Sequence, residues 1–222
     1  MFIPIDVIPI KVFLYKYSTY IYMKIYILRH EDRTMDATFF APLTQDGLTN
    51  SIKLINILDK ENIDCVFCSP FIRTLQTIHP YTKYKKLKIN IDHSLAEIQH
   101  PHIIPVKSYT INLPTYIAEQ FNYNPNYVSL MNPNDHKYPE VDKNVHDRVK
   151  TFISKVIEDM MESKHNVVIV THQIVCNIIL QMATKKKGMN FESTFNYPRG
   201  ALTKIFDEDS FTFAPINWKY KA

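Results

Sequence analysis

Short apolar segments, each followed by a polar turn, alternate with segments of helical periodicity, and this alternation limits the possible folds. Residues 23–28, 63–68 and 166–170 are apolar or aromatic at all but one position each, as expected for strands buried on both faces. The regions between them repeat apolar residues at helical spacing, most clearly from residue 145 to residue 160. The pattern predicts an α/β sandwich of three layers, in which helices cover both faces of a mainly parallel sheet.

One helix is predicted in residues 46–58, where apolar residues recur at helical spacing. A second, short helix would begin after the next strand, because Ser69 can serve as its N-cap and Pro70 as a first-turn residue. This short helix would carry Arg73. For the first helix, we expect the buried face to consist of Leu48, Ile52, Ile55 and Leu58.

The stretch from residue 93 to residue 142 is rich in proline, asparagine and histidine and shows little periodicity. We expect a long excursion over the surface, with one short helix near residues 114–121. Connections of this length in a compact domain usually serve a function, for example as a lid. The other predicted elements are a strand at 88–92, a helix at 173–184 and a hairpin formed by 201–206 and 211–216.

The first 22 residues differ from the rest of the chain. They are apolar and aromatic, but three charged residues and two prolines interrupt them, so that no uncharged run is long enough to span a membrane. They also lack the pattern of a signal peptide. We expect residues 1–22 to be an appendage, with Met23 as an alternative start, and residues 23–222 to form one domain. Membrane contact is not expected, although attachment of residues 1–22 to a membrane surface stays open as an alternative.

The composition excludes several classes of binding site. With only three glycines, the chain has no glycine-rich phosphate loop of the P-loop or dinucleotide-binding type. A net charge of +4 without a long basic cluster argues against a nucleic-acid partner. Cys65 and Cys68 lie three apart in a predicted strand and would point to opposite faces, so they could not act as a pair. Buried free thiols are typical of a reducing compartment, and we expect a cytoplasmic location.

Chemically versatile side chains follow three of the predicted strands. Arg29 and His30 come after the first strand, Ser69 and Arg73 after the second, and His172 after the fourth. The carboxyl ends of parallel strands meet at one edge of a sheet, and ligands bind there in folds of this kind. A single histidine at a strand end is usually a hydrogen-bonded structural residue. Two histidines and two arginines that converge on one edge instead predict a functional crevice.

Five short segments carry a pattern that can be compared with known families. They are LRHE at residues 28–31, PLTQDG at 42–47, CSPFIRTLQT at 68–77, SLAE at 94–97 and VIVTH at 168–172. In this order they resemble the opening signature and the PLTxxG, SSPxxRxxQT, LxE and VxHG motifs of the histidine phosphatase superfamily, also called phosphoglycerate mutase-like. The resemblance extends from residue 24 to about residue 183, apart from the middle loop. It implies the three-layer fold of that family.

The resemblance also implies a mechanism. His30 would attack phosphorus and form a phosphohistidine, while Arg29 and Arg73 hold the phosphoryl oxygens with planar donor groups. His172 would donate a further hydrogen bond to the phosphate. Glu97 would protonate the leaving oxygen and then activate water. The family needs no metal ion and no other cofactor, because the cationic side chains neutralise the charge of the phosphoryl group.

Three positions near the histidines distinguish this chain within the family pattern. Arg33 stands where members similar to the eukaryotic ubiquitin-associated, SH3-containing phosphatases have a further phosphate-binding arginine. Glu31 replaces the commoner glycine after the first histidine, a change that other members share. Gln173 replaces the usual glycine after the second histidine, and its side chain could narrow the site or distort His172.

The other histidines are expected to have structural roles. His93, His100 and His102 lie near Glu97 in the sequence, but their setting is a loop, and we do not expect a metal site there. Surface positions are expected for His136, His146 and His165.

The predicted function is the hydrolysis of a phosphomonoester, with a phosphorylated small molecule or a phosphopeptide as substrate. The first alternative is a mutase that moves phosphate within a sugar acid, although the residues after His30 are unlike the mutase continuation. The second is a non-catalytic phosphate-binding or protein-interaction module on the same scaffold, which Gln173 and the long loop keep open.

Overall fold

The computed structural model describes residues 24–36, 38–105, 111–163, 165–184 and 197–206. Five strands form one sheet in the order β3-β2-β4-β1-β5. The first four strands are mutually parallel where they pair, and β5 is antiparallel to β1. The strands are β1 (Ile25–Arg29), β2 (Cys65–Cys68), β3 (Ile89–Ile91), β4 (Val167–Thr171) and β5 (Leu202–Phe206).

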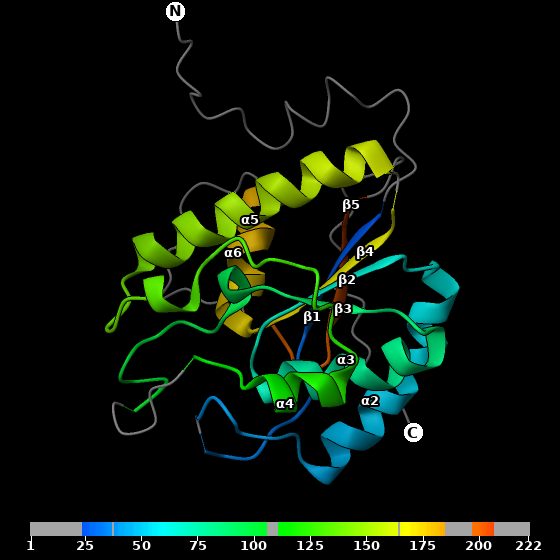
Figure 1. Cartoon of the computed structure of the whole chain (residues 1–222), viewed down its shortest axis with the longest axis horizontal. Helices are drawn as coiled ribbons and strands as arrows, with labels where there is room; N and C mark the ends of the chain where they lie inside the picture. Colours follow the sequence, from blue (N-terminus) through cyan, green and yellow to red (C-terminus); the bar gives the residue numbers. More distant parts are fainter. Residues whose placement is uncertain (1–23, 37, 106–110, 164, 185–196, 207–222) are drawn as a thin grey trace, which may run out of the picture.

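Helices cover both faces of the sheet, as Figure 1 shows, with α5 and α6 on one side and α2 and α3 on the other. The long helices are α2 (Gln45–Leu58), α3 (Ile72–Lys85), α5 (Asp142–Ser163) and α6 (Gln173–Thr184). The short ones are α4 (Thr115–Ala118) and the 3₁₀ turns η1 (Asp59–Glu61), η2 (His93–Leu95), η4 (Glu119–Phe121) and η5 (Pro133–Asp135). This arrangement confirms the predicted three-layer α/β sandwich with a mainly parallel sheet.

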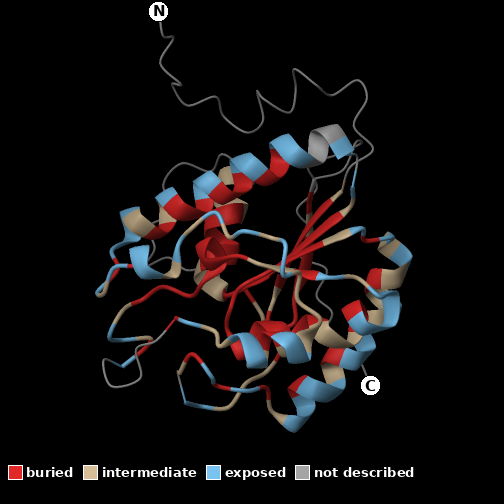
Figure 2. Ribbon diagram, viewed as in Figure 1, coloured by how far each residue is buried: buried red, intermediate tan, exposed pale blue. Residues whose placement is uncertain are grey.

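Each face of the sheet has its own apolar core, and Figure 2 shows the buried residues concentrated on the sheet and on the inner sides of the helices. Alternate residues of β1 divide between the two cores: Ile27 packs with α5 and α6, whereas Leu28 packs with α2 and α3. The same alternation confirms the prediction for the two neighbouring cysteines. Cys65 contacts the core under α5 and α6, and Cys68 lies in the core under α2 and α3.

The register of the parallel strands determines where the site forms. Arg29 at the end of β1 pairs with Thr171 at the end of β4, and Cys68 of β2 pairs with Val170. The next residue of each strand therefore leaves the sheet at the same edge. His30, His172 and Ser69 are brought together in this way, as the sequence predicts.

The buried face of α2 agrees only in part with the predicted one. Leu58 is buried and Ile55 packs against the core, but Ile52 is 59% exposed and Leu48 is exposed as well; the buried residues are Gly47, Ser51, Leu54 and Leu58. The reason is the contact made by Gly47, because a side chain there would overlap the carbonyl oxygen of Asp32. This approach rotates the helix so that its glycine, not its bulkiest apolar residues, faces the loop after β1.

The start of α3 also corrects a prediction. The N-cap is Phe71, which makes no side-chain capping bond, and the helix runs for 14 residues rather than forming a short turn. Ser69 is therefore not the N-cap, and its hydroxyl lies 2.8 Å from the imidazole of His172. Arg73 nevertheless lies in the first turn of α3, as predicted.

The middle region is only partly a surface excursion. The helix expected near residues 114–121 is present as α4 and η4. The first part of the region, 93–99, is buried, and so is His136, for which a surface position was the wrong prediction. His146 is half-buried and His165 is exposed. Within the described residues, no helix has the length and hydropathy that a membrane span requires. The predictions for residues 1–22 and for the hairpin strand at 211–216 lie outside the described residues.

Candidate active site

Two buried histidines form the centre of the site at the carboxyl ends of β1 and β4. His30 is 2% exposed and His172 is completely buried. Their ring centroids are 5.4 Å apart, and the rings meet edge to face. The backbone holds them in this position, since the N–H of His30 donates a hydrogen bond to the carbonyl oxygen of Thr171 over 3.0 Å.

The tautomer of His30 follows from its hydrogen bond. Its Nδ1 atom lies 2.7 Å from the backbone carbonyl oxygen of Glu31, and a carbonyl oxygen can only accept. Nδ1 therefore carries the proton, and Nε2 keeps a free lone pair. Burial lowers the pKa of His30 well below its usual value, and the positive charges of Arg73 and Arg29 lower this pKa further. The imidazole of His30 is therefore neutral at physiological pH and held in one orientation.

The loop that carries this hydrogen bond is enclosed by the segment before β5. Gly200 donates its N–H to the carbonyl oxygens of Arg29 and His30, and its φ of +70° favours glycine. A side chain on Gly200 would also overlap the carboxyl group of Glu31. This segment was not predicted to take part in the site, since its only signal in the sequence is one of the three glycines of the chain.

His172 is held from the end of β2. Its Nε2 atom lies 2.8 Å from the hydroxyl of Ser69, and the ring of Phe71 contacts the imidazole edge to face at 4.8 Å between centroids. Burial lowers the pKa of His172 well below its usual value, and the charge of Arg73 acts in the same direction. The imidazole of His172 is therefore neutral, and the hydroxyl of Ser69 orients it through Nε2.

Arg73 and Arg29 bring positive charge to the two histidines. Arg73 is 2% exposed, donates from Nη1 to the carbonyl oxygen of Thr38 over 3.0 Å and lies 4.4 Å from the ring centroid of Phe71. Burial lowers its pKa to about 9, so it stays charged at neutral pH. Arg29 donates from Nη1 to the carbonyl oxygen of Tyr197. The Nε atoms of both arginines are buried without a hydrogen-bond partner within the described residues, which makes them suitable donors for an anion.

Arg33 lies at the edge of this group. It forms an isolated β-bridge with Leu43 and donates from Nη1 to the carbonyl oxygens of Thr34 and Asp36, over 2.7 and 2.9 Å. Burial lowers the pKa of Arg33, and the negative charge of Glu97 opposes this lowering. The structure therefore places Arg33 within electrostatic range of the site, although the hydrogen bonds it makes hold its own loop.

Glu97 approaches the histidines from the segment after η2. It is 8% exposed, and its Oε1 atom accepts a hydrogen bond from the N–H of Ile98 over 3.1 Å. Its Oε2 atom lies 3.6 Å from Nδ1 of His172. All of the polar residues predicted for the site, with Arg33 at its margin, are thus brought together by the fold.

The histidines that lie near Glu97 in the sequence do not gather into a common site. His93 faces His136 with ring centroids 6.2 Å apart, and His100 stacks on His102 at 4.9 Å. Among the residues that the structure describes, no group of three or more histidine, cysteine or carboxylate side chains is placed to hold a metal ion.

The arrangement is suited to transferring a phosphoryl group. A neutral imidazole nitrogen with a free lone pair can attack phosphorus, and buried guanidinium groups can stabilise charge on the phosphoryl oxygens in the transition state. A buried carboxyl group beside the histidines, such as that of Glu97 near His172, can serve as general acid and base.

Comparisons with known proteins agree with this description. The family model described as histidine phosphatase superfamily (branch 1) matches residues 26–219. No curated protein sequence is significantly similar to the chain. The fold is similar to the ecdysone phosphate phosphatase of Bombix mori in complex with tungstate, with a TM-score of 0.67 and 14% identity, over 82% of this chain and 88% of that one.

Two bacterial structures show the same fold. The alpha-ribazole phosphatase of Shigella flexneri gives a TM-score of 0.57 and 21% identity, over 82% of this chain and 89% of that one. The phosphoglycerate mutase of Bacillus anthracis gives a TM-score of 0.57 and 16% identity, over 84% of this chain and 88% of that one. At these identities the likeness concerns the fold and not the substrate.

Proposed function

Because the chain belongs to the histidine phosphatase superfamily, we propose that it hydrolyses a phosphomonoester through a phosphohistidine formed on His30. The observation that carries the proposal is the hydrogen bond from Nδ1 of His30 to the carbonyl oxygen of Glu31. It leaves Nε2 unprotonated and oriented within a group of buried cations. An arginine-rich anion site would not require that tautomer, whereas a nucleophile does.

In the first half of the reaction, the phosphoryl group lies among Arg29, Arg73 and His172. Nε2 of His30 attacks phosphorus and forms a P–N bond, while the bond between phosphorus and the ester oxygen breaks. Glu97, protonated at this stage, transfers its proton to the departing oxygen, so that an alcohol leaves. The two guanidinium groups stabilise the charge on the equatorial oxygens as the bonds change.

In the second half, a water molecule takes the place of the alcohol. Glu97, now a carboxylate, accepts a proton from this water as its oxygen attacks phosphorus. The P–N bond breaks, inorganic phosphate leaves and Nε2 of His30 regains its lone pair. One carboxyl group thus serves as acid and then as base, and the site returns to its starting protonation state.

His172 and Arg33 complete the proposed phosphate site. Ser69 can donate its hydroxyl proton to Nε2 of His172, which leaves the imidazole proton on Nδ1, on the side of Glu97. Arg33 is assigned to phosphate binding, by analogy with the ubiquitin-associated, SH3-containing type that residues 29–33 resemble. The substrate class is a phosphorylated small molecule or a phosphopeptide, with no metal ion or cofactor in the reaction.

A reducing, cytoplasmic location is proposed together with this function. The three cysteines are free thiols, and Cys68 and Cys176 are buried in the cores. Burial raises the pKa of Cys65 to about 11, which makes this half-buried thiol unreactive at neutral pH.

The proposal is tested by the release of nitrophenol from p-nitrophenyl phosphate, with and without EDTA. We expect activity that resists EDTA, is lost in His30→Ala and is retained in His165→Ala, an exposed histidine that serves as the matched control. A labelled phosphoenzyme that is stable in alkali and labile in acid should be trapped in the wild type. Full activity of His30→Ala would overturn the proposal. A phosphoenzyme that passes its phosphate to a sugar acid rather than to water would indicate a mutase.

A further inference from the structure

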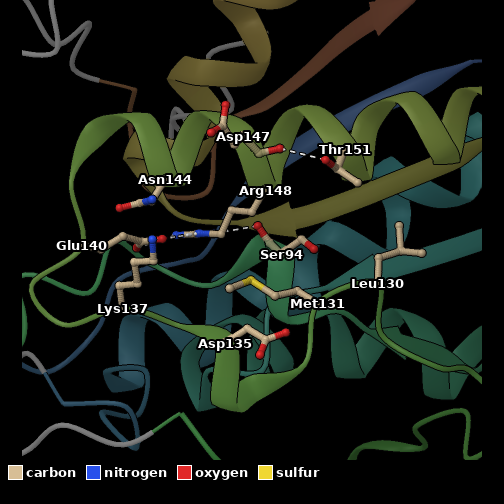
Figure 3. Close-up of a pocket in the computed structure, with 10 residues that line it drawn as sticks. All are labelled: Ser94, Leu130, Met131, Asp135, Lys137, Glu140, Asn144, Asp147, Arg148 and Thr151. Atoms are coloured by element: carbon tan, nitrogen blue, oxygen red, sulfur yellow. Dashed lines mark hydrogen bonds and ion pairs between the residues drawn. The ribbon is translucent and has the colours of Figure 1, made fainter. Parts of the chain in front are cut away.

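The segment that carries Glu97 is held in place by a buried ion pair from another part of the chain. Arg148 of α5 is 7% exposed and Glu140, just before that helix, is 1% exposed. Nε of Arg148 lies 2.7 Å from Oε1 of Glu140, and Nη2 lies 3.1 Å from Oε2, so the two groups form a two-pronged pair. Figure 3 shows this pair beside Ser94, at a surface hollow of about 280 Å³.

The arginine uses its remaining donors on the backbone of the Glu97 segment. Nη1 of Arg148 donates to the carbonyl oxygen of Ser94 over 2.6 Å, as drawn in Figure 3. Nη2 reaches the carbonyl oxygen of Glu97 at 3.5 Å. The same carbonyl oxygen of Glu97 accepts from the side-chain amide of Gln99 over 2.5 Å. The guanidinium group therefore binds the backbone both at Ser94 and at Glu97, the proposed acid.

Glu140 completes this set of contacts on the other side of Glu97. Its Oε2 atom accepts a hydrogen bond from the N–H of Gln99 over 3.0 Å, and its own N–H donates to the carbonyl oxygen of Gln99 over 2.6 Å. All the contacts that the pair makes to this segment go to backbone atoms, from residue 94 to residue 99. The pair thus fixes the path of the main chain.

The backbone path decides where the carboxyl group of Glu97 lies. Its Oε1 atom is bound to the N–H of the next residue, Ile98, which ties the side chain to its own main chain. A small shift of this segment would therefore change the 3.6 Å separation between Oε2 of Glu97 and Nδ1 of His172. General acid catalysis depends on the position of the acid, so even a small displacement of this carboxyl group would slow proton transfer.

Stability alone is a weak explanation for such a pair. Removing two charges from water costs free energy that their attraction recovers only in part, and apolar residues of similar volume often stabilise a core as well or better. The geometry accounts for the charges better, because apolar side chains could not bind the three backbone groups, at Ser94, Glu97 and Gln99, that the side chains of the pair reach.

We infer that Arg148 and Glu140 are a positioning pair that places the carboxyl group of Glu97 for proton transfer. The inference rests on the proposed function, in which Glu97 protonates the leaving oxygen. The hydrogen bonds of the two residues go to each other and to the backbone of residues 94–99, so we expect loss of the pair to affect the proton-transfer steps and to leave the phosphate-binding side chains in place.

The test compares substrates that differ in their need for an acid. An alkyl phosphate such as β-glycerophosphate must receive a proton as its alcohol leaves, whereas nitrophenolate can leave p-nitrophenyl phosphate without one. The variant Glu140→Gln/Arg148→Met removes both charges together and leaves no buried ion unpaired. We expect its kcat/KM to fall about 10- to 100-fold for the alkyl phosphate and less than about threefold for the aryl phosphate.

Two further variants make the result decisive. Lys155→Met removes an exposed ion pair with Asp159 on the same helix and should leave both substrates unaffected. Glu97→Gln should show the same substrate dependence as the double variant, with a larger loss. Arg148→Lys keeps the charge but not the planar group, and we expect partial retention of alkyl phosphate activity.

The failure of the inference and the failure of the proposed function are distinguishable. If Glu97→Gln discriminates between the substrates and the folded double variant does not, the pair has no positioning role. If Glu97→Gln itself shows no discrimination, Glu97 is not the acid, and both ideas are overturned. Should the double variant not fold, Arg148→Lys decides between the two outcomes, because equal losses on both substrates would contradict positioning.

Discussion

The hydroxyl of Ser69 lies 2.8 Å from Nε2 of His172, and this hydrogen bond connects the ends of two neighbouring strands, β2 and β4. Both groups are buried. The bond gives one ring nitrogen of His172 a partner and decides which nitrogen can face the phosphate. Ser69 is therefore an orienting residue of the site and not a helix cap.

Replacement of Ser69 by alanine should reduce activity without unfolding the protein. We expect kcat/KM to fall roughly tenfold and the free energy of unfolding to fall by about 1 kcal/mol, because a buried imidazole nitrogen loses its partner. The measurements are p-nitrophenyl phosphate kinetics and urea denaturation. Thr49→Ala, which removes a hydroxyl from the exposed side of α2, is the control. Unchanged kinetics would show that His172 does not need this bond.

The location of the histidines could be predicted from the sequence because it depends on strand geometry. Buried strands are recognisable from their composition, parallel strands end at one edge, and the residues after them must meet there. His30 and His172 follow from this reasoning without any knowledge of the loops. The family resemblance adds Glu97, which no periodicity would have placed near them.

Contacts between side chains far apart in the sequence could not be predicted in the same way. Glu140 lies in a region without periodicity, and nothing in the sequence relates it to the backbone of Gln99. The prediction for the buried face of α2 was wrong at Leu48 and Ile52 for a related reason. Helical spacing fits several faces of an apolar helix, and the contact of Gly47 with the backbone of Asp32 determines which of them is buried.

A side chain at position 47 should be poorly tolerated. A Cβ atom on Gly47 would overlap the carbonyl oxygen of Asp32, which is backbone and cannot move alone. We expect Gly47→Ala to lower the free energy of unfolding by about 1–3 kcal/mol, although alanine is the better helix former. Urea denaturation measures the change, with Thr49→Ala on the exposed side of the same helix as the control. A stabilised Gly47→Ala protein would contradict the contact.

Inorganic phosphate should stabilise the protein through its buried arginines. Arg73 has no carboxylate in ion-pair contact within the described part of the chain, so an anion that reaches it supplies the missing charge. Phosphate at about 100 times its Kd should raise the free energy of unfolding by about 2.7 kcal/mol and shift Tm upward by several degrees. Arg73→Met should abolish this shift while leaving the protein folded. An equal shift in both proteins would place the bound phosphate elsewhere.

Glu31 adds a pH dependence of its own to the stability. Its carboxyl group is buried beside Gly200, and burial raises its pKa from 4.5 to about 7, although a hydrogen bond from Asn50 acts in the opposite direction. Between these two values the folded protein holds a proton that the unfolded chain releases. The free energy of unfolding therefore falls as the pH rises through this window, by an amount on the order of 3 kcal/mol. Above the window, Glu31 causes no further fall.

The buried histidines act in the opposite sense, so the effect of Glu31 must be isolated by difference. Burial lowers the pKa of His30 in the folded protein. Below the usual pKa of 6.5, the imidazole therefore takes up a proton when the chain unfolds, and the free energy of unfolding decreases as the pH falls.

Glu31→Gln removes the carboxyl group but keeps the carbonyl oxygen that orients His30. We expect this variant to gain stability relative to the wild type as the pH rises from 4.5 to 7 and to keep a constant advantage above pH 7. Urea denaturation at several pH values measures the difference, with Glu119→Gln, an exposed carboxyl, as the control. A difference between Glu31→Gln and wild type that does not change with pH would show that Glu31 titrates in the folded protein as it does in the unfolded chain.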